Sequence, residues 1–154
     1  MRARSLKPGD IYEIETKDGF SYFQYTHKNR LMGTLIWMLK GKFHEPKELG
    51  DVQSLPHLYC TFFPVQGVHK AGLIRWLGTA PIPESRQNFP VFRTATGQNN
   101  DLWWFWDGEK EWRVGDITKA QLKLPVREIH NFPSLVRLIE MNWLPELGKE
   151  VWDM

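Results

Sequence analysis

Two glutamates near the N-terminus, Glu13 and Glu15, are the first residues in the chain whose type and spacing could do chemistry. Residues two apart on a β-strand share a face, so the two carboxyl groups would be neighbours. Such a pair can work in acid–base catalysis when one carboxyl group is desolvated. Tyr12 and Ile14 would then occupy the buried face, and we expect both glutamates to face solvent.

The histidines and the single cysteine predict neither a metal site nor a nucleophile. No two of the five histidines have the spacing that places two ligands on one face of a strand or helix. Cys60 lies in an apolar segment beside Tyr59 and Phe62, whereas a reactive thiol needs a partly exposed, electropositive setting. We expect a buried structural cysteine, no metal, no cofactor and no enzymatic activity. A hydrolase that uses Glu13 and Glu15, or the loop at His27, is kept as the least favoured functional hypothesis, after the two binding functions given below.

Four consecutive aromatic residues, Trp103–Trp106, form the most unusual segment of the chain. The Asp107-Gly108 pair that follows, with a second aromatic segment behind it, favours a β-hairpin. Successive side chains of a strand face opposite sides, so Trp103 and Phe105 point outward if the other two point inward.

Three interpretations of the outward aromatic pair stay open. Exposed aromatic residues often serve as anchors in protein interfaces. They could also stack nucleobases, or the strand could be central, with a helix over its second face. Base stacking needs a basic groove, and the nearby charges are largely acidic (Asp101, Asp107, Glu109 and Glu111). A net charge of only +2 also makes a nucleic-acid partner a weaker expectation.

A second candidate patch is the basic segment His27-Lys28-Asn29-Arg30. It follows the second predicted strand and could hold an acidic partner. The alternative interpretation is a solvated turn, which is the usual role of such a segment.

The elements that must position these residues are mostly strands. Alternating residues over 10–14 and 21–25, with Gly19 between them, predict an opening hairpin. The nearly continuous apolar segment Leu31–Leu39 predicts a strand buried on both faces. Further strands are expected at 58–65, 72–78, on both sides of 107–108 and at 126–129, with a long loop at 80–98 and short helical turns near 51–55 and 118–121.

One helix is expected late in the chain. Asn131 can cap it, and Leu135, Leu138, Ile139 and Trp143 follow at helical spacing. The helix should stop before Pro145. The whole pattern predicts an α+β fold: a mostly antiparallel, twisted sheet or half-barrel of about six to eight strands, with one C-terminal amphipathic helix covering an open end or face.

Composition limits the class of protein. A chain of 154 residues with 42% apolar and 25% charged residues fits one domain, residues 1–154, with its own core. The basic N-terminus leads into no apolar segment, so neither a signal peptide nor a membrane span is expected. A lone cysteine is typical of a reducing compartment. We expect a cytoplasmic protein with no membrane partner.

Several motifs together resemble one protein family. The segment Lys7-Pro8-Gly9-Asp10-Ile11-Tyr12-Glu13-Ile14, followed by Gly19 and Tyr22-Phe23-Gln24-Tyr25, resembles the opening of the bacterial immunity protein 26 family. Similar features recur at Thr61-Phe62-Phe63-Pro64, Pro81-Ile82-Pro83, Phe89-Pro90-Val91-Phe92-Arg93, Trp106-Asp107-Gly108 and Gly115, so the resemblance extends from Lys7 to about Pro145.

The resemblance implies a cytosolic antidote that binds a bacterial toxin domain, including toxins of contact-dependent growth inhibition, and blocks its active site or substrate access. It supplies no catalytic residues. The expected partner is therefore a cognate toxin domain, with a small β-barrel module that binds nucleic acid as the alternative. The candidate toxin-binding residues are Trp103, Phe105, Glu109, Glu111, His27, Lys28 and Arg30.

Overall fold

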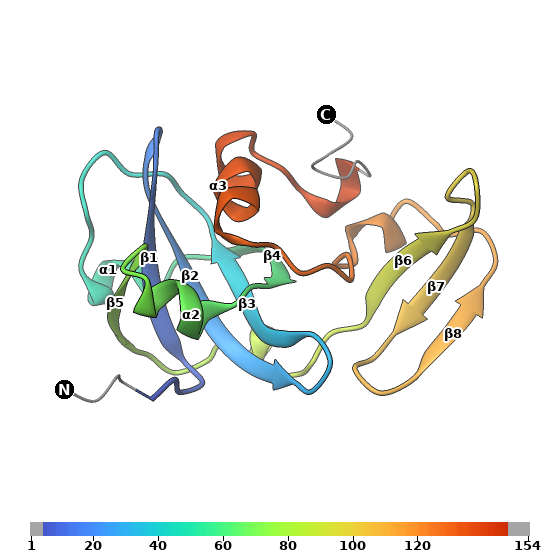
Figure 1. Cartoon of the computed structure of the whole chain (residues 1–154), viewed down its shortest axis with the longest axis horizontal. Coiled ribbons are helices and arrows are strands. Elements are labelled where there is room, and N and C mark those ends of the chain that lie inside the picture. Colours follow the sequence, from blue (N-terminus) through green and yellow to red (C-terminus); the bar gives the residue numbers. More distant parts are fainter. Residues whose placement is uncertain (1–4, 148–154) are drawn as a thin grey trace.

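Two antiparallel sheets and three α-helices make up residues 5–147, the part of the chain that this computed structural model describes (Figure 1). The first sheet has five strands in the order β4-β3-β2-β1-β5. Its strands are β1 Asp10–Thr16, β2 Gly19–Asn29, β3 Gly33–Leu39, β4 His57–Phe62 and β5 Ile74–Thr79. The second sheet has the order β6-β7-β8, with β6 Phe92–Thr96, β7 Leu102–Trp106 and β8 Glu111–Val114. The predicted α+β class is confirmed.

The opening hairpin forms where the sequence predicts it. β1 pairs with β2 in a register that places Thr16 opposite Gly19 and Tyr12 opposite Phe23. Gly19 has φ +114°, and a Cβ there would collide with the backbone carbonyl oxygen of Phe43. Glycine is therefore required at this turn by its backbone angle and by the close approach of a second chain segment.

The five-stranded sheet is buried on both faces. One face carries Tyr12, Phe23 and Ile36 into the largest core cluster, which α3 covers. The opposite face carries Ile11 and Leu39 into a cluster beneath the segment 41–56, and Leu35 and Trp37 into a cluster beneath the second sheet. Leu35–Leu39 is buried throughout, so the prediction of a strand covered on both faces is confirmed for that part of β3.

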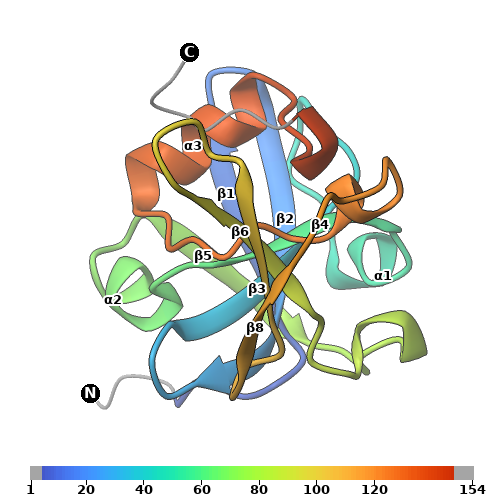
Figure 2. The ribbon, with the colours of Figure 1, turned by 90° about the vertical axis from the view of Figure 1, so that its right-hand side faces the viewer.

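The late helix is confirmed, but it ends at Glu140, so Trp143 lies in the segment after it. α3 spans Phe132–Glu140, and Asn131 caps it by accepting a hydrogen bond from the Ser134 backbone N–H at 2.9 Å. Leu135, Leu138 and Ile139 are buried in the core of the five-stranded sheet. Figure 2, an end view, shows α3 lying across that sheet. The stripe of apolar residues thus covers an open face, as its spacing predicts.

Two expectations about strands are wrong. The segment 80–98, expected to be a loop, contains a 3-10 helix (η1, Glu84–Arg86) and strand β6. The segment 126–129, expected to be a strand, makes only isolated bridges, between Arg93 and Val126 and between Phe62 and Ile129. It contacts β6 and then β4, so it links the two sheets and joins neither as a full strand.

The helical turns are displaced from their predicted places. α1 spans Leu49–Val52 and a 3-10 turn, η2, spans Gln121–Lys123. A short helix that the sequence pattern did not predict, α2 (Val65–Lys70), follows Pro64. A final 3-10 turn, η3, spans Pro145–Leu147. These short elements pack on the outside of the first sheet or close the connections between strands, and their composition resembles that of loops.

Candidate binding surface

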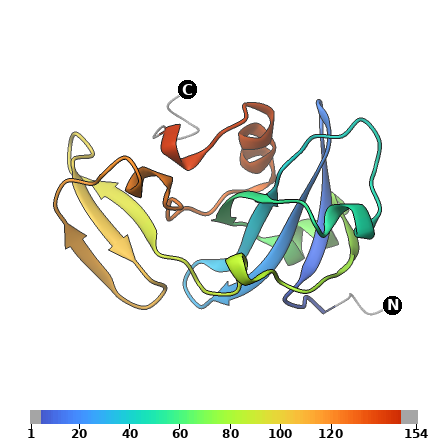
Figure 3. The same cartoon turned by 180° about the vertical axis from the view of Figure 1, so that it is seen from behind.

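Two turns from different sheets lie side by side along the lower edge of the molecule, near the middle of its long axis (Figures 1 and 3). They are residues 27–32, which form the end of β2 and the β2–β3 turn, and residues 107–110, the β7–β8 turn; together we call them the hairpin end. The Asn29 side-chain amide donates a hydrogen bond to the Gly108 carbonyl at 3.1 Å. A cleft of about 280 Å³ separates the turns, lined by His27, Lys28, Asn29, Phe89, Asp107, Gly108 and Glu109. The fold therefore joins the two patches that the sequence predicted separately.

His27 is a structural part of this surface. Its Nε2 lies 2.8 Å from the Gln87 carbonyl oxygen and its Nδ1 lies 2.8 Å from the Thr26 hydroxyl oxygen. The carbonyl can only accept, so Nε2 carries the proton and Nδ1 accepts from Thr26. The ring also packs edge-on against Phe89. With both nitrogens engaged, His27 fixes the connection between η1 and β6 to the first sheet.

The β7–β8 turn is held by its own aspartate. One carboxylate oxygen of Asp107 accepts hydrogen bonds from the Lys110 and Glu109 backbone N–H groups, at 2.8 and 2.9 Å. These bonds favour the charged carboxylate and lower the pKa of Asp107. Gly108 has φ +102° and lies against the Phe89 ring. These contacts hold the turn in one conformation, in which Glu109 and Lys110 are exposed to solvent.

Charged side chains of both signs surround the cleft. Lys28, Arg30 and Glu109 are exposed and have no ion pair within residues 5–147. Glu111, by contrast, forms a 2.9 Å ion pair with Arg127, whose guanidinium lies 4.1 Å from the centre of the Trp106 ring. Three of the predicted charged contacts are thus available to a partner, and Glu111 already has one.

The hairpin end also exposes apolar residues that the sequence analysis did not select. Leu31 is 69% exposed at the tip of the β2–β3 turn. Trp112, on β8 just after the β7–β8 turn, is 40% exposed. Leu31 was assigned to a buried strand because it begins an apolar segment, but Gly33 marks the true start of β3. Its position between basic residues and a glycine was the available signal for a turn.

The aromatic strand alternates as predicted. In the β-sheet register, Phe105 faces the same side as Arg93 and Trp112, while Trp106 shares the opposite side with Phe92. Only Trp106 is fully buried; the other three aromatic residues of β7 are half-buried.

Neighbouring side chains partly cover the outward pair. The Arg93 guanidinium lies 5.6 Å from the centre of the Trp103 ring. Trp112 meets Phe105 edge-on, with ring centres 6.3 Å apart. Trp103 and Phe105 therefore form part of an aromatic face whose most exposed member is Trp112.

The expected solvent-facing position of Glu13 is wrong. Its side chain is only 7% exposed, accepts a 2.7 Å hydrogen bond from the Tyr22 hydroxyl and pairs with both Nε and Nη2 of Arg75. The segment 41–56 covers this side of the sheet, and Lys47 reaches it through a backbone N–H bond to Tyr22. Glu15 stays exposed. The two carboxyl groups therefore occupy different environments, and Glu13 holds three elements together.

A group that the sequence analysis missed lies at the start of α3. His130, nearly fully buried, has Nδ1 2.6 Å from the Ser134 hydroxyl and Nε2 3.2 Å from a Glu128 carboxylate oxygen. The four-residue spacing of His130 and Ser134 was the available signal. Ser134 also donates its backbone N–H to the cap residue, so the group fixes the helix to the segment 125–130.

Cys60 is buried as expected, and burial raises the pKa of its thiol. The described residues contain no group of three or more His, Cys, Asp or Glu arranged to hold a metal ion. Within the same range, no helix has the length and apolarity that a membrane span requires.

Comparisons with protein-family models, curated proteins and solved structures found no significant match to this chain.

Proposed function

We propose that this protein is an immunity protein that binds a bacterial toxin domain in the cytosol, and that it does so through the hairpin end. The observation that carries the proposal is the junction of the two turns. It brings an exposed leucine and unpaired charges of both signs together at two joined turns, with the exposed Trp112 following on β8. The resemblance of the strand and turn motifs to those of immunity proteins supports a toxin domain as the partner.

The chemistry of the hairpin end fits a protein partner. Trp and Arg are the residue types that dominate binding energy in protein interfaces, and Trp112 and Arg30 belong to them. Leu31 adds an apolar contact at the tip, while Lys28 and Glu109 provide a polar rim. A stable complex needs about 800 Å² on each partner, so the interface would extend from the turns onto the β7–β8 face.

Rigidity is a second reason for the choice of surface. Asn29 ties the turns together, Asp107 fixes the β7–β8 turn, and His27 fixes the β2 side. A surface that is ordered before binding loses less conformational entropy when the complex forms. Tight neutralisation of a toxin benefits from this property.

The test is a co-expression and pull-down experiment with the toxin domain encoded beside the gene. The parent protein should restore growth and retain the toxin on an affinity resin. Leu31→Asp should weaken retention by at least about tenfold, which is the effect of losing one anchor residue. Leu73→Asp is the matched control, because Leu73 is an exposed leucine (48%) in the α2–β5 turn, outside the hairpin end.

Two results would contradict the proposal. If the parent protein neither protects cells nor retains the toxin domain, the function is wrong. If Leu31→Asp and Leu73→Asp retain the toxin domain equally well, the hairpin end is not the binding surface. A titration with a single-stranded oligonucleotide at low salt belongs beside the pull-down, since binding that falls steeply with added salt would favour the nucleic-acid alternative.

A further inference from the structure

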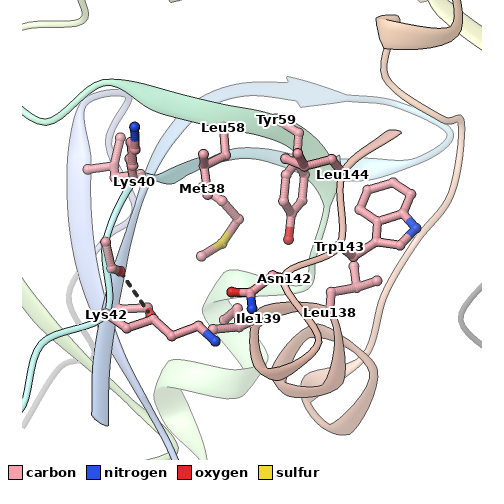
Figure 4. Close-up of a pocket in the computed structure, with 13 residues that line it drawn as sticks. Met38, Lys40, Lys42, Leu58, Tyr59, Leu138, Ile139, Asn142, Trp143 and Leu144 are labelled. Carbon is pink, nitrogen blue, oxygen red and sulfur yellow. Dashed lines mark hydrogen bonds between the residues drawn. The ribbon is translucent and has the colours of Figure 1, made fainter. Parts of the chain in front are cut away.

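A cavity of about 310 Å³ lies between the five-stranded sheet and the C-terminal end of α3 (Figure 4). Its walls are mainly apolar, formed by Met38 from the sheet and by Leu138, Ile139 and Trp143 from the helix and the segment after it. Leu58, which is exposed, lies at its edge. The cavity has no residue in common with the hairpin end. Its volume is at the lower end of the range of small-molecule sites, about 300–1,000 Å³.

A buried hydroxyl group points into this cavity. Tyr59 is only 5% exposed, and its ring meets Trp143 edge-on at 5.1 Å. Figure 4 shows the phenolic oxygen directed into the cavity, towards Asn142. No hydrogen bond to this hydroxyl is formed within the described residues. Burial raises the pKa of Tyr59, so the group stays protonated and can donate. A buried donor without a partner lowers stability, and a ligand that accepts its hydrogen bond removes that cost.

The charge of the lining favours an anion. Lys40 and Lys42 line the cavity, and no Asp or Glu does. Lys42 contacts Asp18 at 3.2 Å outside the lining, whereas Lys40 is exposed and has no ion pair within residues 5–147. The Asn142 side chain also points inward (Figure 4) and can donate through its amide. Apolar walls, two polar groups directed into the cavity and the unpaired charge of Lys40 beside it together select an amphipathic, negatively charged ligand.

We propose that this cavity binds a small amphipathic carboxylate. The alkyl or aromatic body lies against Met38, Leu138 and Trp143, and the carboxylate accepts hydrogen bonds from the Tyr59 hydroxyl and the neighbouring Asn142 amide. This proposal does not depend on toxin binding, because the two surfaces are separate.

The test is a calorimetric titration of the full chain with octanoate, with 1-octanol as an uncharged probe of equal chain length. Octanoate should bind saturably at one site, at least about tenfold more tightly than octanol. Tyr59→Phe removes only the hydroxyl and should weaken octanoate binding by at least about tenfold, the effect of one hydrogen bond to a charged group. Lys40→Glu should weaken it as well, with Lys70→Glu as the control at an exposed lysine on α2.

A blocking variant keeps the test independent of Tyr59. Leu58→Trp adds bulk at the cavity edge and should abolish octanoate binding, while Leu73→Trp, at an exposed leucine elsewhere, should bind like the parent. Circular dichroism confirms that each variant is folded. The absence of saturable octanoate binding, equal binding of octanol, or equal behaviour of the two tryptophan variants would each overturn the proposal. The Leu31→Asp variant should bind octanoate normally, which separates this result from the fate of the toxin hypothesis.

Discussion

The two sheets of this protein differ in how completely they are covered. Every strand of the five-stranded sheet contributes buried residues, and core clusters fill both of its faces. The three-stranded sheet is covered near Phe92 and Trp106, while most of β8 is exposed. Figure 3 shows the second sheet beside the first, connected by the segments before β6 and after β8. The difference predicts that the first sheet provides most of the stability; under the proposed function, the second sheet provides a contact surface.

The largest expected effect compares an aromatic residue from each sheet. Phe23 is fully buried between Tyr12 and Phe63. Phe23→Ala should lower the free energy of unfolding by about 3–5 kcal/mol, because it leaves a cavity in the main core. Trp112→Ala should cost less than about 1 kcal/mol, since Trp112 is 40% exposed and lies outside the core clusters. Urea unfolding measures both; equal losses would remove the contrast between the sheets.

A second comparison uses glycines that all have positive φ. Gly19→Ala should cost at least about 2 kcal/mol, because the new Cβ strikes the Phe43 backbone in addition to the conformational strain. Gly33→Ala meets nothing within 4 Å, so only the strain of about 1 kcal/mol should be lost. Gly108→Ala should fall between them, as the Phe89 ring can shift. If Gly33→Ala proves as costly as Gly19→Ala, the close approach at Gly19 contributes little to stability.

Two tyrosines sharpen the contrast within the first sheet. The Tyr22 hydroxyl donates to Glu13 and accepts from the Lys47 backbone N–H, and burial raises its pKa to about 12. Tyr22→Phe should therefore destabilise the protein by about 1–2 kcal/mol. Tyr59→Phe should be at least as stable as the parent, because the lost hydroxyl has no partner within residues 5–147. A melting temperature lower than that of the parent would show that the Tyr59 hydroxyl does have a hydrogen-bond partner in the folded protein.

The smallest effect is a pH dependence at the edge of the first sheet. Burial, and secondarily the positive charge of Arg86, lower the pKa of His57 from its ordinary 6.5. Because the pKa of His57 is about 6.5 in the unfolded chain and lower in the folded protein, the unfolded chain binds more protons once the pH falls below about 6.5. His57 should contribute stability above pH 6.5 that is lost as the pH falls through its folded-state pKa. Unfolding at about pH 7.5 and about pH 5.5 should show this loss in the parent, and His57→Gln should reduce it.

The sequence predicted the elements that have a clear period. The opening hairpin, the strand Leu35–Leu39 and α3 all follow from alternating or helical spacing with a cap or turn residue at the boundary. Short elements were missed or displaced. β6 and α2 have five and six residues, too few to establish a period beside several prolines.

The sequence predicted several residues of the candidate site but not how they lie relative to one another. His27, Lys28 and Glu109 were chosen from local composition, and only the fold places them around one cleft. Glu13 was misassigned because alternation in β1 says which residues share a face but not what covers that face. The covering segment, 41–56, has the composition of a loop. Burial by a distant segment depends on tertiary packing, which local patterns do not contain.

Hydrogen–deuterium exchange on the complex with the toxin domain recovered by pull-down tests the central claim most directly. The hairpin end (residues 27–32 and 107–110) and the adjoining Glu111 and Trp112 are predicted to gain protection at their backbone amides on binding, while α2 and β5 exchange as in the free protein. Protection confined to α2, β5 or the segments around Tyr59 and Trp143, with the hairpin end unchanged, would contradict the account.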